Sequence, residues 1–368
     1  MLDYKESNKT FFVDQDTINV CLKDKIQDIS IFYNFFRKYK NSLRGAKQVE
    51  NKYSGYVDAD ITMIHIAERN VNKSKLMDDV FFEYRKGKFV DTSKVIQDFY
   101  KDYKLQWGRV PDIKNPHNLD EIWFSKYMTS EYQRNYYLAD KLQVREFVKE
   151  RGLSNILIPL IDVFDTGDVD INRLPQNFAL KLNTGVNHNI FFRNGNRFNQ
   201  ESINQIVKKW LSKTTYRPTP IEVHYDKIIP RLYAERYIGT STTIPTTYEV
   251  YCVKGEPIFI TVADFSYNDK TMVKSINYIQ SYDIDWKLLP WYKRVFKNVP
   301  KPKALADICQ IASKLSRGID LARVDLFDIN GKIFFNEITI SPGGFIFSSW
   351  NTSGIEAAGS IALSILKK

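Results

Sequence analysis

Apolar and aromatic residues recur every three or four positions in two segments near the start of the chain, which predicts two helices. These segments are residues 27–43 (QDISIFYNFFRKYKNSL) and 92–107 (TSKVIQDFYKDYKLQW), and residues 61–68 (ITMIHIAE) alternate more like a strand. Residues 108–118 concentrate Gly, Pro and Asn, which is typical of a boundary. The pattern therefore predicts a mainly helical N-terminal region over residues 1–115.

Helical spacing continues from residue 119 and ends on Gly152, a residue suited to the position after a helix. From about residue 156 the period becomes strand-like, with short β-rich segments separated by turn residues. Two amphipathic helices interrupt the strands, and a helix rich in small residues closes the chain. Hairpins that alternate with packed helices predict an α+β fold. The predicted strands lie within 155–164, 176–185, 188–196, 227–239, 247–265 and 322–340, and the helices within 199–213, 301–318 and 351–368.

Composition narrows the class of protein but not its function. The chain has 368 residues, 43% of them hydrophobic, and a formal net charge of +10. This charge favours anionic partners, but the lysines are scattered and no nucleic-acid-binding motif is present. No stretch is long and apolar enough to span a membrane, and three isolated cysteines (Cys21, Cys252 and Cys309) indicate a reducing compartment. We expect a soluble, cytoplasmic protein, for which a homodimer is plausible.

The segment ARVDLFDINGKIFFNEITISPGG (322–344) reads as a hairpin with an arginine and two carboxylates on its strands. Asn330-Gly331 favours a two-residue turn, which would place Asp325 opposite Asn336. A three-residue loop pairs Asp325 with Glu337 and Arg323 with Thr339 instead. That register gathers the polar side chains on one face, so we predict the longer loop.

Opposed carboxylates repel one another, so something must hold Asp325 and Glu337 together. A divalent cation bridged by phosphate oxygens would do so, and so would a salt bridge with Arg323. The residues alone favour neither.

Five motifs, in the same order along the chain, resemble the teichuronopeptide-biosynthesis (TupA-like) branch of the ATP-grasp superfamily. The R-V-D…E-x-T-x-x-P-G hairpin carries the first resemblance, because the branch has Thr where most ATP-grasp enzymes have Asn. The others are NPHNLDEIWFSKY (with Ile122 at the usual Lys), ADKLQVREFVKERG, LPQNFALKLNTG and YAERYI. The similarity spans about residues 115–345.

The resemblance implies an ATP-grasp fold, in which two α+β lobes enclose ATP. Residues 116–175 would form connecting helices and strands, residues 176–245 the small lobe, and residues 246–368 the C-terminal lobe with the metal site. Residues 1–115, which the motifs do not cover, would recognise the acceptor.

The resemblance also assigns roles to single residues. Asp325, Glu337 and Thr339 would bind Mg²⁺, and Arg323 would act catalytically on the acyl phosphate. Lys141, on the same predicted helix as Arg145, and Lys181, on an apolar strand, would bind the ATP phosphates. Further ATP contacts would come from Asn183, Gly185, Glu235, Arg236 and Ile238.

Two stretches depart from the family pattern. In the predicted phosphate loop, NTGVNHN (183–189), only Gly185 readily adopts positive φ, although Asn tolerates it. In TTYEVYCVKGEP, Thr247 and Glu249 replace the usual Asp and Lys. Glu249 is then a candidate for the ribose contact.

The implied activity is ATP-dependent ligation of a carboxylate to an amine. By resemblance the carboxylate is a uronic acid, perhaps nucleotide-linked, of a capsular or other surface polysaccharide, and the amine is an amino acid or small amino alcohol. One alternative is a glycosyltransferase, for which the chain has two D-x-D triplets, at 168–170 and 283–285. A nucleotide-binding module without catalysis is the other. The four histidines (His65, His117, His188 and His224) do not have the spacing of metal ligands.

Overall fold

The structure is a computed structural model of the 368-residue chain. The chain separates into two compact units, Met1–Val90 and Asp91–Lys368. The helix α4 (Thr92–Trp107), which the sequence pattern groups with the N-terminal region, belongs to the second unit. The structure describes residues 34–36, 63–65, 92–129, 132, 134–193, 198–213, 216–240, 244–268, 273–293 and 298–367.

In the first unit only two short strands are described. The strand β1 (Asn34–Phe36) pairs antiparallel with β2 (Met63–His65), and Phe35 lies opposite Ile64. The strand predicted around residues 61–68 is therefore confirmed at its centre. The helix predicted over 27–43 is wrong at Asn34–Phe36, because pairing with a distant strand overrides local helical spacing. The rest of that predicted helix lies outside the described residues.

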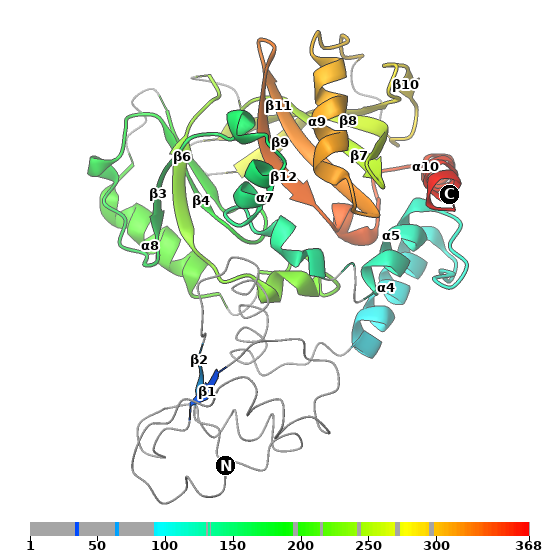
Figure 1. Ribbon diagram of the computed structural model, residues 1–368, viewed down its shortest axis with the longest axis horizontal. Helices are drawn as coiled ribbons and strands as arrows, with labels where there is room; N and C mark the ends of the chain where they lie inside the picture. Colours follow the sequence, from blue (N-terminus) through cyan, green and yellow to red (C-terminus); the bar gives the residue numbers. More distant parts are fainter. Residues whose placement is uncertain are drawn as a thin grey trace, which may run out of the picture. The chain divides into compact units, whose positions relative to one another are not determined.

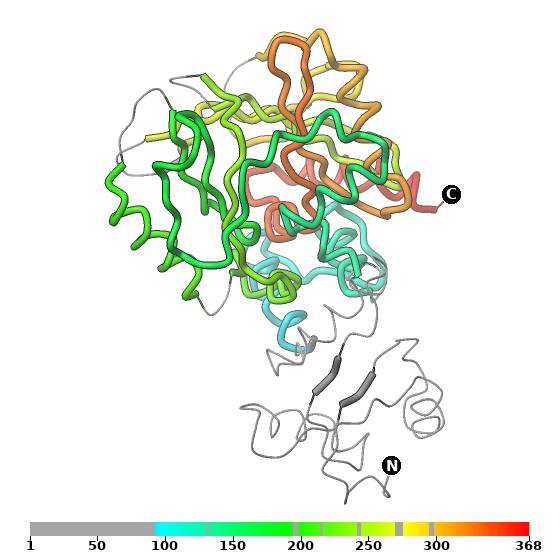
Figure 2. The backbone as a smooth tube through the Cα atoms, turned by 60° about the vertical axis from the view of Figure 1, so that its left-hand side comes forward, coloured from blue at the N-terminus to red at the C-terminus, as the bar shows by residue number. Residues whose placement is uncertain are grey.

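The second unit contains two antiparallel sheets, which lie side by side in Figures 1 and 2. The smaller sheet has the strand order β3-β6-β4-β5. Along β4, Phe178 and Leu180 pack into a core with α8 (Gln200–Leu211), whereas Ala179 and Lys181 face the other way, as predicted. Its strands are β3 (Leu160–Phe164), β4 (Phe178–Leu182), β5 (Asn189–Phe192) and β6 (Leu232–Arg236).

The larger sheet has six strands in the order β10-β9-β8-β7-β11-β12. One face packs against α9 (Leu305–Ser316), which lies on β7, β8 and β11 and ends before Gly318. The buried Cys252 on this face is next to Ser316 of that helix. The strands are β7 (Thr247–Val253), β8 (Glu256–Asn268), β9 (Val273–Tyr282), β10 (Leu288–Leu289), β11 (Leu321–Ile329) and β12 (Lys332–Thr339).

The remaining helices connect and brace the sheets. The helix α5 (Leu119–Tyr127) begins at Asn118, whose side chain accepts a hydrogen bond from the Glu121 amide, and it packs against the C-terminal helix α10 (Thr352–Leu366). A short 3₁₀ helix, η2 (Arg134–Ala139), and α7 (Val144–Glu150) follow α5. Gly152 follows Arg151, the C-cap residue of α7, and has φ +66°, as expected.

Two expectations from the sequence are corrected by the structure. Lys141 does not lie on the helix that carries Arg145, but in a turn of residues 141–143 just before it. The Asp140 carboxylate accepts hydrogen bonds from the amides of Leu142 and Gln143 at 2.8 and 3.2 Å. These bonds hold residues 141–143 in a turn, so the helix begins only at Val144.

The second correction concerns the β11–β12 hairpin. Asn330-Gly331 does form the two-residue turn, with φ +55° and +84°, between the paired residues Ile329 and Lys332. Asp325 nevertheless lies opposite Glu337, as predicted, because a β-bulge shifts the register between Asp325 and Leu326. The predicted register is confirmed and the predicted loop is wrong.

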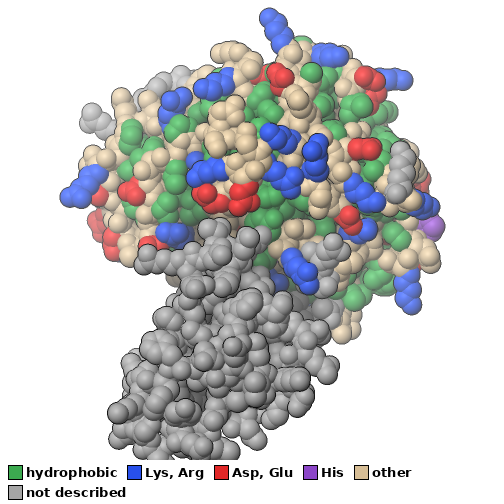
Figure 3. Space-filling view, in the orientation of Figure 1, with side chains coloured by type: hydrophobic (Ala, Val, Ile, Leu, Met, Phe, Trp, Pro, Cys, Tyr) green, Lys and Arg blue, Asp and Glu red, His purple; other side chains and the backbone are tan. Residues whose placement is uncertain are grey.

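Charged side chains of both signs lie on the visible face of the second unit (Figure 3). On the face drawn in Figure 3, Lys and Arg side chains are interspersed with Asp and Glu. Among the described residues no helix has both the length and the apolar character to cross a bilayer.

Candidate active site

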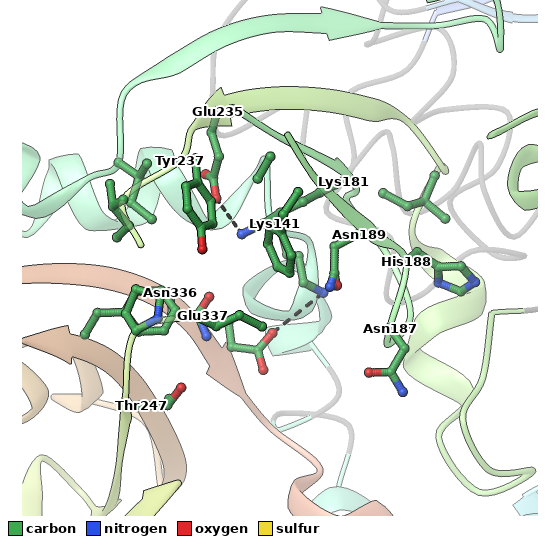
Figure 4. Close-up of a pocket in the computed structure, with 18 of the residues that line it drawn as sticks. Lys141, Lys181, Asn187, His188, Asn189, Glu235, Tyr237, Thr247, Asn336 and Glu337 are labelled. Carbon is green, nitrogen blue, oxygen red and sulfur yellow. Dashed lines mark hydrogen bonds and ion pairs between the residues drawn. The ribbon is translucent and has the colours of Figure 1, made fainter. Parts of the chain in front are cut away.

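A cavity of about 220 Å³ lies between the two sheets of the second unit. Its walls come from β4, β5 and β6 of the small sheet, the segment after β6, and β7, β11 and β12 of the large sheet (Figure 4). The sequence-predicted site residues that line this cavity are Lys141, Lys181, Gly185, Glu235, Arg236, Ile238 and Glu337.

On the small sheet, Lys181 forms a close ion pair with Glu235 of the neighbouring strand β6. Their Nζ and Oε1 atoms are 2.5 Å apart, and Figure 4 shows the two side chains pointing toward each other. Arg145 lies 3.7 Å from the other oxygen of Glu235 and donates a hydrogen bond to the carbonyl of Ile158. Two cations therefore surround one carboxylate on this wall.

Lys141 connects the small lobe to the large sheet. Its Nζ donates to the carbonyl of Gly185 at 3.0 Å and lies 3.6 Å from Glu337. Its backbone amide donates to the carbonyl of Asn183 at 2.9 Å, which fixes the turn to the end of β4. A lysine held in this way reaches both the predicted phosphate loop and a predicted metal ligand.

The predicted phosphate loop adopts the conformation that its sequence allows. Gly185 has φ +71°, as expected, and Asn187 has φ +59°, a conformation that Asn tolerates. The imidazole of His188 packs against Gly185, and its Nε2 is 2.6 Å from the Nζ of Lys213. Burial and the charge of Lys213 lower the pKa of His188 to about 4, so the imidazole is neutral near pH 7.

On the large sheet, three carboxylates on adjacent strands surround one guanidinium. Glu249 of β7, Asp325 of β11 and Glu337 of β12 are register neighbours. The Nη2 atom of Arg323 lies 2.6 Å from Asp325 and 3.5 Å from Glu337, and its Nη1 atom lies 3.9 Å from Glu249. The salt bridge considered from the sequence is thus present.

Burial dominates the electrostatics of this group. Burial raises the pKa of Asp325, the Arg323 charge opposes this rise, and the charges of Glu249 and Glu337 add to it. Burial by itself lowers the pKa of Arg323. The negative charges of Asp325 and Glu249 raise this pKa by more than burial lowers it, so the net shift is upward. The Arg323 guanidinium therefore stays charged, and its single positive charge is shared among three carboxylates.

The donor set of this group fits a Mg²⁺ ion bound together with phosphates. The opposed carboxylates Asp325 and Glu337 are hard oxygen ligands, and Thr339, opposite Arg323, offers a neutral oxygen two pairs further along the ladder. Within the described residues no group of three or more His, Cys, Asp or Glu side chains has the geometry of a complete metal site. Mg²⁺ commonly binds through one or two carboxylates and takes its other ligands from phosphate and water.

Five predicted site residues do not line the cavity: Asn183, Glu249, Arg323, Asp325 and Thr339. Asn183 is buried, and its side chain is fully engaged. It donates to Asp140 and to the carbonyl of Ile229, both at 3.0 Å, and accepts from the amide of Arg231 at 2.7 Å. It holds the Lys141 turn in position.

Sequence reasoning did not identify some of the residues that line the cavity. Thr247 lines it, whereas Glu249, two residues further along β7, faces Arg323. Tyr237 and Asn336 also line it. Strand alternation places Thr247 on the same face as Glu249, and this was the one signal in the sequence for Thr247. No signal in the sequence indicated a bulge at Asn336.

Three solved structures resemble the chain at low identity. D-alanine–D-alanine ligase from Bacillus anthracis is 13% identical, with a TM-score of 0.37, over 64% of this chain and 70% of that one. The ATP-grasp ligase PsnB with its minimal precursor is 10% identical (TM-score 0.36; 66% and 63% covered). D-cycloserine synthetase DcsG is 11% identical (TM-score 0.36; 63% and 70% covered). No curated protein matches the chain.

The family profile described as TupA-like ATP-grasp matches residues 120–355. This range covers most of the second unit and includes both sheets and the cavity between them. It also agrees with the range of about 115–345 over which the sequence motifs resemble that branch. The chain therefore belongs to the TupA-like ATP-grasp family.

Proposed function

We propose that this chain is an ATP-dependent carboxylate–amine ligase that forms an amide through an acyl phosphate. The observation that carries the proposal is the opposed pair Asp325 and Glu337, with Arg323 between them and Lys141 linking Glu337 to the loop at Gly185. Cations on one wall and carboxylates on the other suit a metal–triphosphate complex.

In the first step a carboxylate oxygen of the substrate attacks the γ-phosphorus of ATP and ADP leaves. In the second step an amine nitrogen attacks the acyl carbon, inorganic phosphate leaves, and the nitrogen loses a proton. Bound Mg²⁺ would neutralise phosphate charge, held by Asp325, Glu337 and Thr339. Lys141 and Lys181 would bind the phosphates, and Arg323 would stabilise the oxyanion formed by amine attack.

We propose that the carboxylate is a uronic acid, free or nucleotide-linked, of a capsular or other surface polysaccharide. The amine would be an amino acid or a small amino alcohol. Residues 1–115 would recognise the acceptor. The assignments of the acid and the amine rest on the family resemblance, which does not extend to residues 1–115.

The glycosyltransferase alternative has less support from the structure. Its D-x-D triplets lie outside the cavity lining, and Asp168 is exposed and paired with Lys208. Asp283 accepts hydrogen bonds from the backbone amides of Asp285 and Lys287, an ordinary role for a turn residue.

The deciding experiment is a screen for ADP release with uronic acids and UDP-uronic acids, each combined with a panel of small amines. A ligase yields ADP, phosphate and a product whose mass is that of acid plus amine less one water. Release of UDP without ADP would favour the transferase. ATP binding without turnover in the whole panel would favour the non-catalytic module.

A further inference from the structure

The β-bulge in the β11–β12 hairpin turns one more polar side chain into the cavity. Asp325 pairs with Glu337 and the next residue, Leu326, pairs with Phe335, so Asn336 has no residue opposite it. In a regular strand Asn336 and Glu337 would point to opposite faces of the sheet. A bulge re-aims a side chain, and here both residues line the cavity and lie next to each other in Figure 4.

The position of Asn336 along the cavity indicates which part of a nucleotide it would meet. On one side is Glu337, 3.6 Å from the Nζ of Lys141, at the end that carries the phosphate-binding candidates. On the other side the chain continues to Phe334, which packs with Phe327 and Ile158 in an apolar cluster. A base would occupy the apolar end and phosphates the charged end, so Asn336 lies at the level of the ribose.

The chemistry of Asn336 also suits this location. Its side-chain amide has both a hydrogen-bond donor and an acceptor. It can therefore pair with the vicinal hydroxyls of ribose, each of which can donate and accept a hydrogen bond. Within the described residues no hydrogen bond engages this side chain, and it is half-buried. Glu249, the residue expected from the sequence to contact ribose, lies beside Arg323 instead.

We propose that Asn336 binds the ribose hydroxyls of the nucleotide and thereby selects ribonucleotides. This inference rests on the proposed function only in that the cavity must bind ATP. It names a residue that lies within the hairpin motif, at a position that the motif leaves unspecified.

The test is calorimetric titration of the full chain, with Mg²⁺ present and no carboxylate substrate, against ATP, 2′-deoxy-ATP, 3′-deoxy-ATP and GTP. The natural chain should bind ATP about 5- to 10-fold more tightly than at least one deoxy analogue, the worth of one hydrogen bond. Asn336→Ala should weaken ATP binding by a similar factor and remove the preference. Asn336→Asp, whose carboxylate can accept from both hydroxyls, should retain the preference.

Asn189→Ala is the matched control, since Asn189 lines the same cavity from β5 of the small sheet. It should leave the ratio of ATP to deoxy-ATP affinity unchanged. A ratio that is unchanged in Asn336→Ala would overturn the inference, as would a change confined to the ratio of ATP to GTP affinity. A natural chain that binds none of the four nucleotides would overturn the proposed function together with the inference.

Discussion

The two sheets that face the cavity carry opposite surpluses of charge. At the small sheet two cations, Lys181 of β4 and Arg145 of the helix α7, surround the single carboxylate of Glu235. On the large sheet one guanidinium, Arg323, lies among the carboxylates Glu249, Asp325 and Glu337. Lys141 connects the two groups, with its Nζ 3.6 Å from Glu337.

This difference explains how the site can bind a metal and a polyanion together. Charges that are largely buried are costly unless they are compensated. An anion placed against the small sheet and a cation placed against the large sheet would each correct the local imbalance. Removing a charged group from the large sheet should therefore lower the metal-dependent turnover. Removing one from the small sheet should lower the affinity for the nucleotide.

The largest expected effect is on the large sheet. Asp325→Asn and Glu337→Gln should each lower Mg²⁺-dependent ADP release by about 10³-fold, because a metal ion supplies several kcal/mol of charge stabilisation to phosphoryl transfer. Steady-state assays over a range of Mg²⁺ concentrations would measure this loss. Thr339→Val removes only a neutral oxygen and is the matched control, with a loss of about 10-fold or less. Rates within 3-fold of the natural chain in both carboxylate variants would refute the metal assignment.

The second effect concerns the small sheet. Lys181→Met should weaken ATP binding by about 10²-fold, because it removes a charge-assisted contact and leaves the buried Glu235 with Arg145 alone. Titration calorimetry would measure the dissociation constant. Lys181→Arg keeps the charge and should lose much less. If both variants bind ATP as the natural chain does, the cation surplus of this sheet has no role in binding.

Strand alternation and strand pairing were the features most accessible from the sequence. The faces of β4 could be predicted because Phe178 and Leu180 alternate with Ala179 and Lys181. The pairing of Asp325 with Glu337 followed from gathering the polar residues on one face. The strand β9 was missed because Ser, Asn and Gln dilute the apolar half of its alternation.

Features that depend on a single backbone irregularity could not be predicted. The sequence around Asn330-Gly331 indicated a tight turn, but this turn and the Asp325–Glu337 register are compatible only if one residue bulges. The turn at Lys141 depends on the side chain of Asp140 bonding to the backbone, a competition that periodicity does not report.

A third prediction separates support from ligand binding on the small-lobe side. Asn183→Ala removes three hydrogen bonds made by a buried amide and leaves Asp140 without one donor. The free energy of unfolding should fall by about 3 kcal/mol, measured by urea titration. ATP affinity should fall only to the extent that the loss of Asn183 displaces Lys141. Unchanged stability with lost ATP affinity would instead establish Asn183 as a direct ligand, the role that the family resemblance implies.

The smallest effect is expected at Glu249, the carboxylate farthest from Arg323. Glu249→Gln leaves the 2.6 Å contact between Arg323 and Asp325 intact and removes a charge whose oxygen is 3.9 Å away. We expect turnover to fall by about 3- to 5-fold with ATP affinity unchanged, because this pair is the loosest of the three and a single polar interaction has a net worth of about 1 kcal/mol. Parallel measurement of kcat and of the ATP dissociation constant would show this. A loss of ATP affinity together with the preference over deoxy-ATP would instead return the ribose contact to Glu249, and the large sheet would then bind nucleoside and metal through one row of carboxylates.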